Sequence, residues 1–278
     1  MALEDEDLIK KWKKATLANT FIFYKVMRNH PEACRHLIEM LLKIKIQKMV
    51  IRSEETIDLQ FSSKAIRLDV FVKDNKRMYD VEMQIRNTKD LPERSRYYQG
   101  LMDLDTLKKG ETYKCLKDSH VIFICMRNIF KDNNKDLPVY TFQNVCLEDY
   151  ELKLNDRTFK HFFIAPTCAK IIEDEELKAF FNFLISNHVN NKYTTELNDY
   201  VEKAKENMQW RSQFMTWERM ENYRYNEGHE AGLRKGRRDK AVADAVLLVK
   251  KYKVSPQEAC KDVRAPLKKV LEVLEKKN

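Results

Sequence analysis

The spacing of apolar residues predicts that the chain begins with helices. Residues 5–28 carry apolar side chains between charged ones, which is typical of an amphipathic helix. A second helix is predicted over 31–42, with Asn29 or His30 as its cap and Pro31 in its first turn. One face of this helix is apolar, as expected of a helix that packs on a core, and comprises Cys34, Leu37, Ile38, Leu41 and Leu42.

The middle of the chain changes to the alternation that is typical of strands. Short runs of β-branched and aromatic residues stand between turn residues, and helical stretches follow them. The predicted elements are a strand within 44–51, a hairpin of strands 66–73 and 79–85, a helix over 91–110, a buried strand over 120–128, two or three strands within 138–164 and a helix over 173–187.

This order predicts an α/β (α+β) fold, with a mixed central sheet that is flanked by helices. We expect the folded domain to span residues 1–190, a polar helical arm to follow over 191–239, and a small helical tail to occupy 240–278. The tail is predicted to contain three short helices. Ser255 should cap the second of them, with Pro256 at its first position.

Composition narrows the class of protein. The 278 residues include 52 Lys and Arg and 43 Asp and Glu, so the net charge is +9, which suits a polyanionic partner such as nucleic acid. No apolar run is long enough to span a membrane, and the first residues do not resemble a secretion signal. The six cysteines form no C-x-x-C pair and no zinc spacing, so we expect reduced thiols in the cytoplasm.

The predicted hairpin carries acids inside its strands, where acids are unfavourable. Strict alternation places Asp80, Glu82 and Gln84 on one face of the second strand. A tight loop centred on 75–76 brings Asp69 of the first strand opposite Glu82, with Cβ atoms about 5 Å apart.

Two opposed carboxylates repel each other unless a positive charge lies between them. A divalent cation with oxygen ligands, Mg²⁺ or Mn²⁺, fits that place and suits phosphodiester hydrolysis. Gln84 shares the face of Glu82, so its amide can orient water or a phosphate oxygen. The alternative is an ordinary solvated hairpin face whose acids lie outside.

The stretch RLDVFVKDNKRMYDVEMQ, with the later RSRYYQG and GETYK, resembles the PD-(D/E)XK nuclease family transposases, also called the Rpn family of recombination-promoting nucleases. The similarity covers roughly residues 19–190. It implies a restriction-endonuclease-like core and a role in DNA recombination or transposition.

The resemblance also implies roles for residues. Asp69 matches the metal-binding aspartate, Glu82 matches the acid of the (D/E)XK element, and Gln84 takes the place of the lysine. The superfamily often adds a glutamate from the first core helix as a metal ligand, and Glu39 is the best-placed acid here. The alternative for Glu39 is an exposed helical glutamate.

Three residues of the helix after the hairpin are candidates for binding nucleic acid. Arg94 matches the family's arginine and can hold a phosphate, while Tyr97 and Tyr98 can stack on a base. The alternative for the two tyrosines is packing against the sheet.

The arm and tail add a basic segment and a glycine repeat. Gly228, Gly232 and Gly236 lie at spacing four, which favours close helix–helix approach or a flexible arm. Contact with the DNA backbone and a solvated face are both open for the basic residues Arg234, Lys235, Arg237 and Arg238. The tail suits a helix-turn-helix-like module or a homodimer contact equally.

These observations favour a cytoplasmic, bacterial-type, metal-dependent DNA endonuclease. One alternative is a catalytically weak DNA-binding protein that uses the nuclease fold as a scaffold, since Gln84 lacks the charge of lysine. A nuclease that acts on RNA and a purely partner-binding protein are the others.

Overall fold

The computed structural model describes residues 2–51, 70–86, 88–130 and 136–275, with the side chains from residue 5 onward. The chain divides after Arg211 into two compact units. The first unit contains a six-stranded sheet with helices on both faces, so the predicted mixed α/β class is confirmed.

The sheet has the strand order β1-β2-β3-β4-β6-β5. The neighbouring strands β3, β4 and β6 are parallel to one another. Strand β2 pairs antiparallel with β3, β5 pairs antiparallel with β6, and β1 pairs antiparallel with β2. The strands are β1 (Val50–Ile51), β2 (Val70–Lys73), β3 (Arg77–Gln84), β4 (Asp118–Cys125), β5 (Val139–Phe142) and β6 (Thr158–Ile164).

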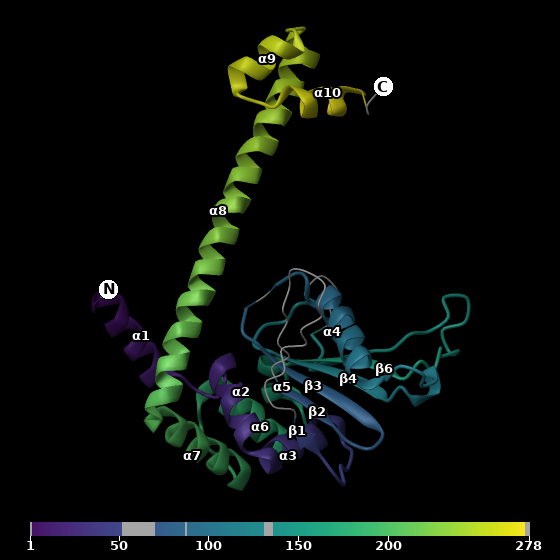
Figure 1. Ribbon diagram of the computed structural model, residues 1–278, viewed down its shortest axis with the longest axis vertical. Helices are drawn as coiled ribbons and strands as arrows, with labels where there is room; N and C mark the ends of the chain where they lie inside the picture. Colours follow the sequence, from purple (N-terminus) through teal and green to yellow (C-terminus); the bar gives the residue numbers. More distant parts are fainter. Residues whose placement is uncertain (1, 52–69, 87, 131–135, 276–278) are drawn as a thin grey trace. The chain divides into compact units, whose positions relative to one another are not determined.

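Helices cover the sheet unequally. Among the described helices of the first unit, α4 covers one face of the sheet, and α2, α3, α5 and α6 gather on the opposite side (Figure 1). Phe163 of β6 stacks on Phe181 of α6 on that opposite side, with 6.1 Å between ring centroids. The elements of this unit are α1 (Ala2–Lys14), α2 (Thr20–Asn29), α3 (Pro31–Leu42), α4 (Leu91–Thr106), the 3-10 helix η1 (Tyr113–Cys115), α5 (Ala165–Ile171), α6 (Glu175–Ser186) and α7 (Lys192–Glu206).

Two predicted boundaries are wrong for local reasons. Residues 5–28 are not one helix, because the Asn19 side chain accepts the Phe21 and Ile22 N–H groups and starts α2 anew. The helix predicted over 91–110 ends at Thr106, since Leu107 is extended. Gly110, at φ 92°, lies in the turn beyond the helix rather than at its end.

Helix α4 is held over β3 at both of its ends, and this fixes its face toward the strand. Near its C-terminus Lys73 of β2 pairs with Asp105, and the Thr106 hydroxyl contacts the Met78 sulfur at 2.7 Å. In between, Tyr98, Leu101 and Met102 are buried in an apolar core with side chains of the sheet. The N-terminal end of α4 is held by polar contacts, which form the site described below.

The second unit consists of most of a long helix, α8 (Met208–Tyr252), and two short ones, α9 (Pro256–Val263) and α10 (Leu267–Glu275). The Ser255 hydroxyl accepts the Glu258 N–H at 3.2 Å, as the predicted cap requires. Val242, Ala245, Ala259 and Val270 form its buried apolar centre. The three glycines lie within α8, and an added Cβ at any of them would meet no atom of the described chain within 4 Å. Close helix–helix approach at these glycines is therefore absent from the described structure.

Among residues 2–51, 70–86, 88–130 and 136–275, no helix combines the length and apolar character needed to cross a bilayer.

Candidate active site on strand β3 and helix α4

The polar face of β3 is buried. Asp80 has no exposed surface, and the exposed fractions of Glu82 and Gln84 are only 4% and 9%. These side chains share the sheet face of Val121 and Phe123 in β4, which α4 covers. The alternative of a solvated hairpin face is therefore wrong, because acids on the surface would not be enclosed in this way.

The predicted register of the hairpin is confirmed for the described strands. Lys73 pairs with Met78, and Val72 pairs with Tyr79, around the turn at 74–76. The Asp74 carboxylate builds this turn by accepting the Lys76 and Arg77 N–H groups, each at 2.7 Å. Asp69 lies outside the described residues. Its pairing with Glu82 therefore stays a prediction. The adjacent described pair, Val70 with Val81, has the register that this prediction requires.

Arg94 joins the two polar residues at the end of β3. Its Nη1 donates to the Gln84 Oε1 at 3.1 Å, and its Nη2 lies 3.6 Å from the Glu82 Oε2. Its Nε and Nη2 also donate to the Tyr98 hydroxyl, at 3.2 and 2.8 Å. A helix turn separates Arg94 from Tyr98, so α4 presents both to the strand. The structure thus brings together Glu82, Gln84, Arg94 and Tyr98, four of the predicted site residues.

The electrostatics of this group follow from burial and opposite charges. Burial raises the pKa of the Tyr98 hydroxyl, and the carboxylates of Glu82 and Asp80 raise it too. Burial acts to lower the pKa of Arg94, but Tyr98 and Glu82 outweigh it and raise that pKa overall. Tyr98 therefore stays protonated and Arg94 stays charged, which leaves a fixed positive charge beside the buried carboxyl group of Glu82.

The two tyrosines of α4 face different surroundings. Tyr98 is 5% exposed and stacks on Phe123 at 6.2 Å between ring centroids, so its ring faces are committed to the core. Tyr97 is 44% exposed. Of the pair, only Tyr97 presents a ring that a base could reach in this structure.

Glu39 lies elsewhere. Its carboxylate accepts the Ile46 N–H at 2.7 Å and pairs with Lys45 at 3.2 Å. Partial burial acts to raise the pKa of Glu39, but these two partners outweigh it and lower that pKa. The structure does not bring Glu39 to Glu82, because α3 packs with α2 and α6 on the other side of the sheet.

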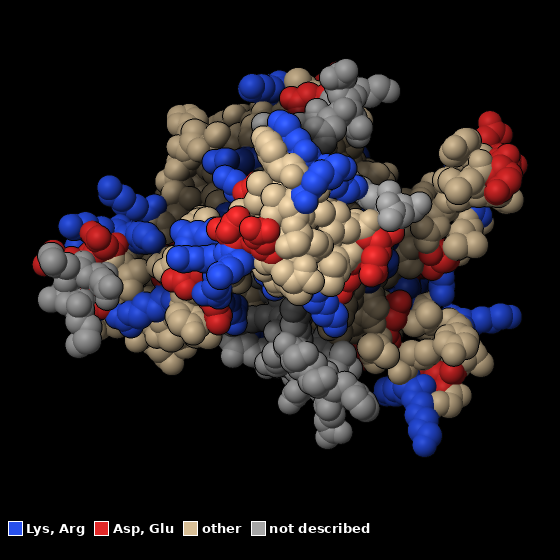
Figure 2. Space-filling view, turned by 90° about the horizontal axis from the view of Figure 1, so that it is seen from above, with Lys and Arg blue, Asp and Glu red and all other residues tan. Residues whose placement is uncertain are grey.

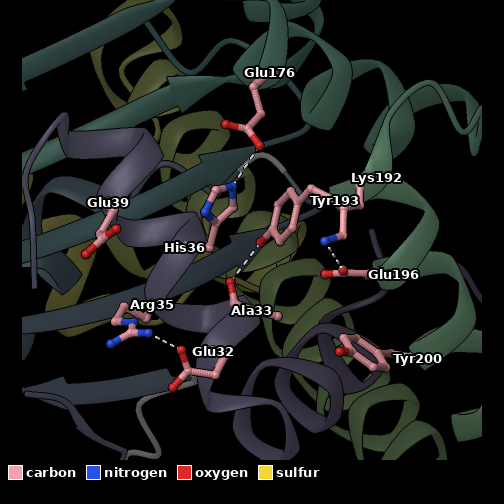
Figure 3. A pocket seen from close by; sticks show the side chains of 10 residues that line it. All are labelled: Glu32, Ala33, Arg35, His36, Glu39, Glu176, Lys192, Tyr193, Glu196 and Tyr200. Atoms are coloured by element: carbon pink, nitrogen blue, oxygen red, sulfur yellow. Dashed lines mark hydrogen bonds and ion pairs between the residues drawn. The ribbon is translucent and has the colours of Figure 1, made fainter.

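Glu39 instead borders a pocket of about 450 Å³ between α3, α6 and α7 (Figure 3). The other acids of this pocket each contact a basic side chain: Glu32 contacts Arg35, Glu176 contacts His36 at 2.8 Å, and Glu196 contacts Lys192 at 3.9 Å. Each acid thus already has a partner, so the pocket offers no group of free carboxylates for a divalent cation.

The donor set on β3 suits a divalent cation. Asp80 and Glu82 supply buried carboxylate oxygens on one face of the strand, and these are the ligands that Mg²⁺ and Mn²⁺ prefer. Within the described part of the chain, no three acids, histidines or cysteines form a complete metal cluster. Asp80 was missing from the predicted metal set, although its position on the face of Glu82 was visible in the alternation. Its burial is what the sequence could not show.

The basic residues of the predicted DNA-binding segment, Arg234, Lys235, Arg237 and Arg238, are all exposed on α8. Arg234 forms an ion pair with Glu230 at 3.4 Å. On the face seen from above, lysine and arginine side chains are interspersed with acids rather than gathered in one patch (Figure 2). Net charge alone therefore does not locate a nucleic-acid surface.

The fold and this site define a nuclease-like protein, and comparison with protein families agrees. Residues 28–243 match the family described as PD-(D/E)XK nuclease family transposase, and the chain belongs to this family. Neither the curated proteins nor the solved structures gave a match.

Proposed function

We propose that this protein is a divalent-metal-dependent endonuclease that hydrolyses DNA during recombination or transposition. The family supports a nuclease or transposase role in general. The observation that carries the finer proposal is the buried Glu82, which lies in one polar cluster with Gln84 and Arg94. Burying such a group costs free energy, and a catalytic role explains why the fold tolerates that cost.

In this proposal Asp69 and Glu82 hold Mg²⁺ or Mn²⁺, and Asp80 adds negative charge beside them. Such an ion, when bound, lowers the pKa of water and stabilises negative charge on a phosphate. Gln84 orients water or a phosphate oxygen through its amide. Glu39 was expected as a further ligand, but its contacts with Ile46 and Lys45 support a structural role instead.

Arg94 compensates for the missing lysine. An amide at position 84 cannot supply positive charge to a phosphate in the transition state. The Arg94 guanidinium lies 3.1 Å from the Gln84 Oε1 and remains charged. Gln84 and Arg94 together therefore supply the hydrogen bonding and the charge that one lysine supplies elsewhere, which argues against a weakly active scaffold.

Nucleic-acid contacts are proposed for exposed residues of both units. In the first unit Tyr97 stacks on a base, and in the second Arg234, Lys235, Arg237 and Arg238 hold the backbone. The tail at 240–278 then serves as a DNA-reading or dimer-forming module. We place the protein in the cytoplasm, since its six cysteines are free thiols.

The test is cleavage of supercoiled plasmid and of an RNA of matched sequence, with Mg²⁺, with Mn²⁺ and with a chelator. Metal-dependent nicking of the plasmid but not of the RNA is expected. Preferred cleavage of RNA would show that RNA is the substrate, and the proposed metal chemistry would still hold. Retardation of DNA in a gel without cleavage under any condition would favour the scaffold alternative, and no salt-sensitive DNA affinity at all would favour a partner-binding protein.

A further inference from the structure

A projecting ribbon between β5 and β6 carries apolar side chains into solvent. Residues 143–157, called the β5–β6 arm below, leave the edge of the sheet after Phe142 and return at Thr158 (Figure 1). All of them are exposed except the half-buried Cys146. Leu147 is 74% exposed and Tyr150 is 75% exposed. Clustered exposed apolar residues are typical of an interaction surface.

The arm is a built element rather than an irregular loop. The Cys146 N–H donates to the Leu152 carbonyl at 2.9 Å, and the Leu154 N–H donates to the Asn144 carbonyl at 3.0 Å. At its base the Asn144 side-chain amide donates to Asp156 at 2.6 Å. A lone two-stranded ribbon is marginally stable in water, so this geometry gains from a partner that covers it.

Both faces of the ribbon need cover. Val145 bridges Lys153, so alternation places Val145 and Leu147 on one face. Leu152 and Leu154 lie on the other face with Cys146. A flat surface would cover only one of these faces, whereas a partner that encloses the arm covers both.

The charge of the β5–β6 arm indicates which kind of partner can bind it. The arm contains Glu148, Asp149, Glu151 and Asp156, against Lys153 and Arg157. DNA phosphates would repel this acidic ribbon, so nucleic acid is a poor partner. The whole chain carries a net charge of +9, so a second copy attracts the acidic arm.

The neighbouring strand points to the same partner. Among the described strands β5 pairs only with β6, so it is the edge of the sheet next to the arm. Phe142, the last residue of β5 before the arm, is 44% exposed, although its ring also contacts Phe130 and Phe162. Exposed sheet edges are common sites of chain association. We propose that two copies of this protein form a symmetric dimer in which each copy encloses the other's β5–β6 arm.

Sedimentation of the full chain over a range of concentrations tests the proposal, which is independent of any nuclease activity. Wild type is expected to sediment as a dimer, and Leu147→Asp with Leu152→Asp as a monomer of half the mass. Both positions are exposed, so these variants keep the fold, as far-UV circular dichroism would verify. Tyr113→Asp, at an exposed apolar position outside the arm, is the matched control and should remain a dimer.

A second variant separates the arm from the tail. Leu271→Asp changes an exposed apolar residue of α10 and should leave the dimer intact. The rate at which a maleimide modifies Cys146 should fall with rising concentration of wild type, but not of the arm variant. A monomeric wild type, or an arm variant that remains a dimer, would overturn the proposal.

Discussion

The two faces of the central sheet carry different titratable groups, and these groups have different partners. On the face under α4, β3 buries Asp80 and Glu82, and Arg94 brings positive charge to Glu82. On the opposite face, β4 and β6 carry a pair of histidines, of which His161 is buried and His120 is half-buried. The His120 Nδ1 lies 3.1 Å from the His161 Nε2, and the His161 Nδ1 lies 3.1 Å from the Thr141 hydroxyl.

None of these hydrogen-bond partners of the two histidines is an acid. Burial therefore decides whether the histidines are protonated. Burial lowers the pKa of His120 to about 3 and that of His161 to about 4, and each is therefore neutral at neutral pH. One face thus buries uncharged groups that hydrogen-bond to one another. The other face buries two carboxyl groups and places the half-buried Arg94 beside one of them, which is the costlier arrangement and the one expected of a functional site.

The largest predicted effect on the rate of cleavage is that of a substitution at Glu82, on the sheet face under α4. Glu82→Gln keeps the shape of the side chain but removes the charge that the cation needs. We expect the rate of plasmid cleavage to fall by about 10³-fold, equivalent to about 4 kcal/mol. Glu176→Gln, which changes an exposed acid of the pocket behind α3, is the matched control and should leave the rate unchanged. Equal losses in both variants would remove the distinction between buried and exposed acids.

Arg94→Ala should lower the cleavage rate by about 10²-fold, because it removes the charge beside the phosphate. It also leaves Glu82 buried without this ion-pair partner, so the melting temperature should fall. Arg94→Lys keeps the charge without the planar group that contacts both Gln84 and Tyr98, and should recover only part of the rate. Full activity in Arg94→Lys would show that position and geometry matter little here.

Lowering the pH should destabilise the protein through the two histidines on the opposite face of the sheet. Unfolding restores the histidine pKa to about 6.5, so below that pH the unfolded chain binds more protons than the folded one. Stability is complete above about pH 6.5 and is lost as the pH falls toward the folded pKa values. We expect urea unfolding to show a loss of about 1–3 kcal/mol between about pH 7.5 and 5.5. A variant with His120→Gln and His161→Gln should lose less stability over this pH range. The same pH dependence as in wild type would show that other groups cause the loss.

The smallest effect is expected for Tyr98→Phe. This change keeps the stacked ring and removes the hydroxyl that accepts two bonds from Arg94. Cleavage should slow by about 3- to 10-fold, the worth of one hydrogen bond. Tyr97→Phe is the matched control and should cleave normally, whereas Tyr97→Ala should weaken DNA binding. A larger effect of Tyr97→Phe on the cleavage rate would reverse the roles assigned to the two tyrosines.

Periodicity predicted the part of the fold that depends on alternation and turns. The loop at 74–76 fixed the register of the hairpin, and the alternation of β3 placed Asp80, Glu82 and Gln84 on one face. The break between α1 and α2 was not predicted, because it depends on a single cap at Asn19. The burial of the polar face was not predicted either, since it depends on where α4 packs.

Tertiary packing also decided which candidate residues meet. Glu39 and Arg94 both lie on helices and both have charges, so sequence did not distinguish their places. Arg94 faces β3 because α4 covers that side of the sheet, and Glu39 turns to the Ile46 N–H on the other side. The pair Arg94–Tyr98 was visible at helical spacing, but the role of Tyr98 in holding Arg94 follows only from its burial.

The central claim is that the buried Glu82 of β3, together with Asp69, binds a divalent cation. Calorimetric titration of the full-length protein with Mn²⁺, without nucleic acid, tests it apart from cleavage. The account predicts that wild type and Glu176→Gln bind the ion alike, and that Asp69→Asn and Glu82→Gln lose binding by at least about tenfold. Equal Mn²⁺ affinity in wild type and in Glu82→Gln would contradict the account and place any metal site elsewhere.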